Sequence, residues 1–221
     1  MRDRPSMDPF LKLFTTSYAG AFAVNLMACL VALLWTLGAD RSTRDPVAWR
    51  GWVAFWIGTG MFYVLKLALL SYPLSWIPWA GLYAATWFLL TSYWESQATG
   101  PWPRARAFWL ATLLVFACAA ADVVTATYTS RSGWHQALTC YAIGIWAWRL
   151  RQVDVSKSVA VLAYAVVQLP LSPVFGILGI EKTEGYDAFV ASTFAIYAVL
   201  KITLIPPIYA AVTRRDLAQA A

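Results

Sequence analysis

The chain has 221 residues, of which 60% are hydrophobic and only 13% are charged. A soluble globular domain carries about 25% charged residues, so this composition excludes an ordinary soluble domain and indicates a membrane protein. The formal net charge is +6, but the basic residues are scattered and form no phosphate-binding cluster, so no nucleic-acid partner is expected.

The apolar segments predict the fold. A membrane-crossing helix needs about 20 mostly apolar residues, and seven segments of the chain approach this length, separated by short connections. We therefore expect an all-α, polytopic membrane protein, a seven-transmembrane-helix bundle that forms a single integral domain over residues 1–221. The fifth segment is the shortest, and a re-entrant or tilted segment would show the same pattern. The expected spans are residues 15–37, 50–72, 74–94, 105–128, 134–149, 157–180 and 187–212.

Basic residues in the flanks of these spans predict the orientation, because cytoplasmic loops carry an excess of Lys and Arg. With seven spans, ten basic residues fall on one side and five on the other. We expect the first set in the cytoplasm, which puts the N-terminus outside, the C-terminus inside, and the protein in the inner or plasma membrane. The ten are Arg41, Arg44, Arg50, Arg104, Arg106, Arg149, Arg151, Lys157, Arg214 and Arg215; the five are Arg2, Arg4, Lys12, Arg131 and Lys182.

Two charged residues lie at matching depth inside the second and fourth expected spans. Lys66 and Asp122 each lie six residues before the outer end of their span, about 9 Å below the outer surface at 1.5 Å per residue. Charged side chains within membranes are costly and usually pair in the bundle interior, so we expect an ion pair between them. Such a pair either fastens two helices together or forms a proton- or ion-coupled gate.

A second lysine, Lys201, lies near the middle of the last expected span. Asn25 in the first span and Gln168 in the sixth fall at comparable depth, and Tyr197 precedes the lysine by one helical turn. An ionisable residue inside a span is a functional-site hypothesis by default. We therefore expect Lys201, Gln168, Asn25 and Tyr197 to line a substrate-binding site.

Prolines interrupt the sixth and seventh spans close to this level. Pro170 and Pro173 follow Gln168, and Pro206 and Pro207 follow Lys201. Each proline frees a backbone carbonyl, which within a bilayer must face protein, water or a ligand. Interrupted helices at mid-depth are typical of transporter binding sites, although proline kinks are also common in membrane helices without such a site.

The remaining residues exclude several kinds of chemistry. The three cysteines are singly placed in apolar segments, so neither a disulfide framework nor a metal site is expected. His135, the sole histidine, cannot build a multi-histidine iron or haem site and is interpreted as interfacial. No motif of a hydrolase or metalloprotease occurs, which leaves enzyme activity open but disfavoured.

The predicted topology and the position of Lys201 resemble those of the microbial rhodopsins. Seven spans, an outside N-terminus and a lone lysine in the last helix are features of that family, as are Trp87 in the third span and Pro170 in the sixth. The resemblance implies a retinal Schiff base on Lys201. The chain departs from the family at Tyr197, where an acidic residue is expected, and in the third span, which carries no arginine.

These observations favour a transporter or permeation protein for a small polar or anionic solute, with no cofactor and no metal. One alternative is a photoreceptor with retinal on Lys201, and another is a structural or regulatory subunit of a membrane complex. The expected partners are the lipid bilayer and a small-molecule solute; a homo-oligomer or a membrane partner protein is left open.

Overall fold

The computed structural model describes residues 18–38, 45–68, 77–96, 103–129, 134–152, 154–167, 192 and 195–200. Every regular element within these ranges is a helix, as the sequence predicts. Residues 195–200 are helical as well. The longer helices are α2 (Tyr18–Gly38), α3 (Pro46–Ala68), α4 (Ile77–Ser96), α5 (Pro103–Thr129), α6 (Trp134–Leu150) and α7 (Val155–Val167).

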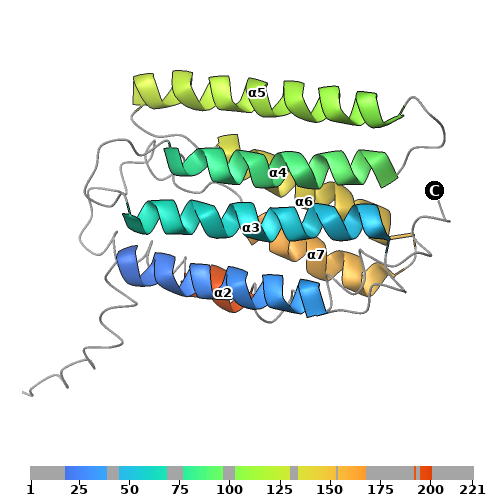
Figure 1. The fold of residues 1–221 in the computed structure, drawn as a ribbon, viewed down its shortest axis with the longest axis horizontal. Coiled ribbons are helices and arrows are strands. Elements are labelled where there is room, and N and C mark those ends of the chain that lie inside the picture. Colours follow the sequence, from blue (N-terminus) through green and yellow to red (C-terminus); the bar gives the residue numbers. More distant parts are fainter. Residues whose placement is uncertain are drawn as a thin grey trace, which may run out of the picture.

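The helices form two layers (Figure 1). Helices α2, α3, α4 and α5 lie side by side in that order, and α6 and α7 lie behind them. Helix α6 contacts α4, α5 and α7. Helices that follow one another in the chain run in opposite directions, because the connections between them are short. Helix α4 consequently has α3 on one side, α5 on the other and α6 behind it.

The predicted positions of the first five spans agree with α2 to α6 within four residues at each end. Within the part of the chain that the structure describes, three helices are long and apolar enough to cross a membrane: Ala19–Gly38, Pro46–Ala68 and Arg104–Thr125. Helix α6 has 17 residues, fewer than a perpendicular crossing needs. The second half of the expected sixth span and most of the seventh lie outside the described residues, so seven crossings stay a prediction.

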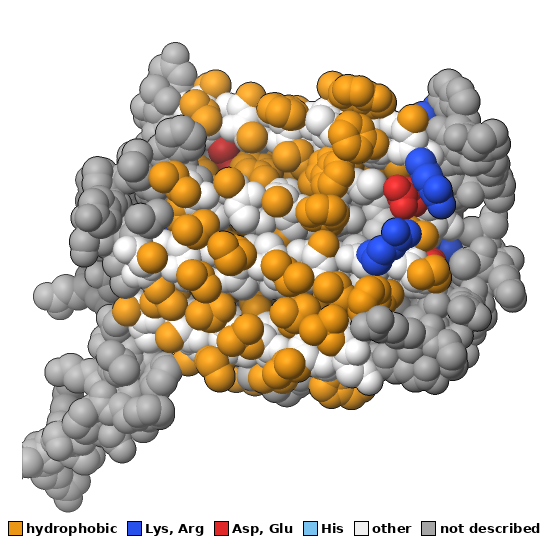
Figure 2. All heavy atoms as spheres, viewed as in Figure 1, with side chains coloured by type: hydrophobic (Ala, Val, Ile, Leu, Met, Phe, Trp, Pro, Cys, Tyr) orange, Lys and Arg blue, Asp and Glu red, His pale blue; other side chains and the backbone are white. Residues whose placement is uncertain are grey.

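Large apolar side chains cover the outside of the bundle as well as its core (Figure 2). Leu113 and Phe116 on α5 are 66% and 70% exposed, and Leu34 on α2 is 69% exposed. Contiguous apolar surface of this kind marks a membrane or protein contact. The interior is aromatic: Trp52, Trp56 and Trp146 are fully buried, and their rings lie 5.8 Å (Trp52–Trp56) and 6.4 Å (Trp52–Trp146) apart.

Helices α3 and α4 approach each other through small residues. A Cβ atom added to Gly58 would lie 2.7 Å from the Cβ of Ala85 and 2.8 Å from the carbonyl oxygen of Gly81. A Cβ atom added to Gly51 would lie 1.9 Å from the hydroxyl oxygen of Ser92. Small residues allow close packing of this kind between membrane helices. Because the backbones of α3 and α4 approach this closely, neither helix can slide along the other or move away from it without losing the contact.

The charged residues gather at one end of the bundle. Of seven described Lys and Arg residues, six belong to the end where α3, α5 and α7 begin and α6 ends. Side chains tie the helices together there: the indole of Trp49 donates to the carbonyl of Thr36 at 3.0 Å, and the guanidinium of Arg149 donates to the hydroxyl of Ser96. The six are Arg50, Arg104, Arg106, Arg149, Arg151 and Lys157; the seventh is Lys66.

The α3–α4 contact predicts opposite effects for two glycine-to-alanine changes. Gly58→Ala should lower the free energy of unfolding by about 1–3 kcal/mol, because the new methyl group meets backbone atoms that cannot move aside. Gly144→Ala is the matched control in the middle of α6, where an added Cβ meets nothing within 4 Å. It should stabilise the protein by about 0.5–1 kcal/mol through helix propensity. Thermal unfolding in detergent micelles measures both, and equal effects would contradict the packing described.

Candidate functional site

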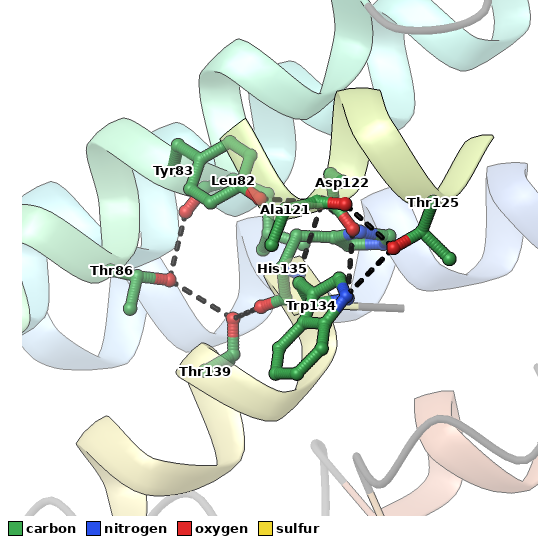
Figure 3. Close-up of polar contacts among 9 residues, drawn as sticks. All are labelled: Leu82, Tyr83, Thr86, Ala121, Asp122, Thr125, Trp134, His135 and Thr139. Carbon is green, nitrogen blue, oxygen red and sulfur yellow. Dashed lines mark hydrogen bonds and ion pairs between the residues drawn. The ribbon is translucent and has the colours of Figure 1, made fainter. Parts of the chain in front are cut away.

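The carboxylate of Asp122, near the end of α5, lies against the first residues of α6 (Figure 3). Its Oδ1 accepts the backbone N–H of Trp134 at 2.8 Å, and its Oδ2 accepts the backbone N–H of His135 at 3.1 Å. The phenol of Tyr83 on α4 donates to Oδ2 at 2.5 Å. Since a helix begins with unpaired N–H groups and a partial positive charge, its N-terminus is a natural binding site for this anion.

The imidazole of His135 completes the shell around the carboxylate. Its Nδ1 lies 3.0 Å from Oδ2 of Asp122, and because an ionised carboxylate only accepts hydrogen bonds, this contact requires a proton on Nδ1. The ring stacks on Trp79 at 4.8 Å between centroids. Asp122 is 1% exposed and His135 5%. Four donors therefore reach the carboxylate, three at Oδ2 and one at Oδ1, and compensate its charge away from solvent.

Threonine hydroxyls extend this cluster towards the middle of the bundle. Thr139 on α6 donates to the carbonyl of His135 at 2.8 Å, and its oxygen lies 3.0 Å from that of Thr86 on α4. Thr86 in turn lies 2.8 Å from the carbonyl oxygen of Leu82. Two hydroxyl protons serve three contacts, so at most two are hydrogen bonds at one time, and the protons can rearrange without movement of any heavy atom.

The ion pair predicted between Lys66 and Asp122 is not present. Among the described residues, the ion pairs are Asp122 with His135 and Asp154 with Lys157. The ammonium of Lys66 lies 5.8 Å from the centre of the Phe62 ring on its own helix. Two residues at the same depth can still lie on helices that are not neighbours. In Figure 1, helix α4 lies between α3, which carries Lys66, and α5, which carries Asp122.

Two of the four predicted substrate-binding residues lie within the described part of the chain. Asn25 is fully buried, and its side-chain amide donates to the carbonyl of Ala21 at 2.9 Å. Tyr197 is partly buried and lies near Tyr63, as does Cys29, which follows Asn25 by one turn of α2. This places Tyr197 near the side of α2 and α3 where Cys29 and Tyr63 pack. Lys201 and Gln168 lie outside the described residues, so their roles, including retinal on Lys201, stay predictions.

Helix α3 carries three buried donors whose acceptors are missing. In the part of the chain that the structure describes, the indole N–H groups of Trp52 and Trp56 and the hydroxyl of Thr59 are buried without a hydrogen-bond partner. These residues are spaced i, i+4 and i+7, so they share one face of the helix. An unpaired buried donor costs about 1–3 kcal/mol, so three on one face are an unusual feature of the core.

Sequence reasoning missed His135 and Tyr83, the two side chains that bind Asp122. The sequence did carry a signal for His135. It is the second residue of an apolar helix that follows, after a short connection, the helix that contains Asp122. A carboxylate near the end of one helix can reach the free N–H groups at the start of the next. No sequence signal distinguishes Tyr83 from other tyrosines.

No group of three or more His, Cys, Asp or Glu side chains suited to a metal ion occurs among the described residues. The chain matches no family model, and comparisons with curated proteins and with solved structures find no significant similarity. Inferences about function therefore rest on the chemistry of the chain itself.

A double-mutant cycle tests the bond between Tyr83 and Asp122. Tyr83→Phe and Asp122→Asn should each lower the free energy of unfolding by about 1–3 kcal/mol. The double variant should lose less than the sum, with a coupling energy of about 0.5–3 kcal/mol. Denaturant unfolding in detergent, followed by far-ultraviolet circular dichroism, gives these values.

Lys66→Met combined with Asp122→Asn is the control cycle. Its effects should add to within about 0.5 kcal/mol, because the two side chains do not interact. Coupling in the control cycle, or additivity in the first, would contradict this description of the cluster.

Proposed function

We propose that the protein is a multi-pass inner-membrane transporter or permeation protein for a small anionic or otherwise acceptor-bearing solute. The observation that carries this proposal is the row of unpaired donors on α3, formed by Trp52, Trp56 and Thr59. An indole N–H donates and never accepts. Two N–H groups that require acceptors, beside a hydroxyl that can donate, suit carboxylate, phosphate or carbonyl oxygens.

The position of these donors also supports the proposal. Trp52 and Trp56 contact each other, and Trp52 reaches Trp146 on α6, so the donors lie between the two layers of the bundle. An aromatic wall with a few hydrogen-bonding groups is the usual lining of a small-molecule site. A solute passing between the layers would meet the three donors in succession along α3.

The predicted site residues fit the same solute. Lys201, Gln168, Asn25 and Tyr197 would provide a positive charge and further donors at the midplane. Tyr197 lies near Tyr63, which follows Thr59 by one turn on α3. In this proposal the donor row of α3 continues into the Lys201 site, and the solute is bound by N–H and O–H groups throughout.

The Asp122 cluster is proposed as the gate, with His135 in the role that the sequence assigned to Lys66. Buried acid–histidine pairs in membrane proteins commonly relay protons. Protonation of Asp122 would remove the charge that holds the start of α6 against α4 and α5. The cluster could thereby link proton movement to a displacement of α6.

The charged end is proposed to face the cytoplasm. It carries six described basic residues against three acidic ones, Asp45, Glu95 and Asp154, and an excess of Lys and Arg marks the cytoplasmic side of membrane helices. The Asp122 cluster would then open towards the outside, in keeping with its proposed role as the outer gate.

Uptake into proteoliposomes tests the transport proposal, with chloride, phosphate and malate as probes. The wild-type protein should accumulate at least one of them. Trp56→Phe should weaken that uptake by about 10- to 100-fold in apparent affinity, the equivalent of one hydrogen bond to a charged group. Lys201→Met should abolish it while the protein remains folded.

Trp109→Phe is the matched control, since Trp109 points outward from α5 and is 62% exposed. It should leave uptake unchanged. The proposal is contradicted if the wild-type protein neither transports any of the three anions nor is stabilised by one of them. Full uptake in both Trp56→Phe and Lys201→Met would equally contradict the proposed route.

Labelling of single cysteines tests the orientation. In a variant whose three native cysteines are replaced by serine or alanine, Gln152→Cys in the turn after α6 should react with an impermeant maleimide only after the cells are permeabilised. Arg131→Cys, in the connection between α5 and α6, should react in intact cells. The reverse pattern would mean that the charged end faces outward.

A further inference from the structure

The outer surface of the front layer contains a groove that neither the proposed transport route nor the Asp122 cluster uses. It has a volume of about 260 Å³ and lies over α4, with α3 and α5 as its sides. Its apolar wall includes Ala54, Trp87, Phe88 and Phe108. Phe88 and Phe108 are 46% and 43% exposed, so the groove opens to the surroundings of the bundle rather than to its interior.

The close approach of α3 and α4 creates the floor of this groove. A Cβ atom on Gly51 would overlap the side chain of Ser92, so the two backbones meet there without large side chains between them. On the far side, the indole of Trp87 donates to Thr112 of α5 at 3.0 Å, which fixes the opposite wall. Specific contacts thus hold both walls, so the shape of the groove is set by the packing of α3, α4 and α5.

One end of the groove carries two opposite charges that do not pair with each other. Arg50 and Glu95 line this end, and neither takes part in an ion pair among the described residues. The Nε of Arg50 donates to the carbonyl of Pro46 at 3.2 Å, and the side chain of Arg50 is exposed. Figure 2 shows acidic and basic side chains together at this end of an otherwise apolar face.

We propose that this groove binds a phosphatidylethanolamine molecule, with an acyl chain along the apolar wall and the head group at the charged end. A guanidinium presents a fork of N–H groups that matches a phosphate. A carboxylate beside it accepts hydrogen bonds from a primary ammonium group. One phosphatidylethanolamine head group carries both a phosphate for Arg50 and an ammonium group for Glu95, the two charged residues that line this end of the groove.

Phosphatidylglycerol and phosphatidylcholine satisfy only part of this site. Phosphatidylglycerol offers the phosphate to Arg50 but has no cation, and it leaves the carboxylate of Glu95 near an added negative charge. Phosphatidylcholine has a quaternary ammonium group that cannot donate a hydrogen bond to Glu95. The pair of charges therefore selects the lipid whose head group carries both a phosphate and an N–H donor.

This inference rests on the membrane location within the proposed function, and not on transport. Native mass spectrometry tests it on the full-length protein, reconstituted in nanodiscs of equimolar phosphatidylethanolamine, phosphatidylglycerol and phosphatidylcholine and released in the gas phase. The wild-type protein should retain one phosphatidylethanolamine at about tenfold excess over either of the other lipids.

Three variants separate the contributions to binding. Arg50→Gln should reduce retention of all phospholipids by about tenfold, and Glu95→Gln should abolish the preference over phosphatidylglycerol without preventing binding. Ala54→Trp should fill the groove and remove the bound lipid. Arg104→Gln changes an exposed arginine outside the groove and should behave as the wild-type protein does.

Several outcomes would overturn the proposal. Equal retention of the three lipids, no retained lipid, or the same result for Arg104→Gln and Arg50→Gln would each do so. A lipid-free dimer whose formation is blocked by Ala54→Trp would assign the groove to a second copy of the chain. A chain that stays in the aqueous phase without detergent would instead refute the membrane location, and with it the proposed function.

Discussion

The packing of α4, α5 and α6 depends on the hydrogen bonds made to one buried carboxylate. Asp122 lies within an apolar bundle, where an isolated ion would be too costly, and its four hydrogen bonds come from α4 and from the start of α6. The same contacts set where α6 begins relative to α5 and hold both against α4. Because a donor removed from such a buried network leaves the charge uncompensated, the junction of the three helices is specified by this one group.

The donors of α3 show the opposite condition, since Trp52, Trp56 and Thr59 are buried and unpaired. The hydrogen bonds made to Asp122 show that this bundle can provide partners for a buried polar group. Selection for stability alone would replace an unpaired indole with a phenyl ring of similar shape. The contrast therefore separates two kinds of polar group in the bundle: those that fasten helices and those that are buried without a partner among the described residues.

Sequence reasoning located the helices well because hydropathy, and the Gly, Pro and charged residues at which apolar segments end, are local properties of the sequence. It could also place Lys66 and Asp122 by depth, which requires only a count along each helix. It could not pair them correctly, because the order of helices around the bundle is a property of the whole chain. His135 was interpreted as interfacial for the same reason: its contact with Asp122 appears only once the start of α6 is known to lie beside that residue.

Helix α4 connects the features on the two faces of the front layer. Tyr83 and Thr86 on α4 join the cluster behind it, while Phe88 and Glu95 line the groove in front. The glycine contacts fix α4 to α3, so these two helices form one unit that carries the unpaired donors. A displacement within the bundle is therefore more easily accommodated between this unit and α6. That boundary is formed by the Trp52–Trp146 contact and the hydrogen bonds of Asp122, and both the Asp122 cluster and the donor row lie along it.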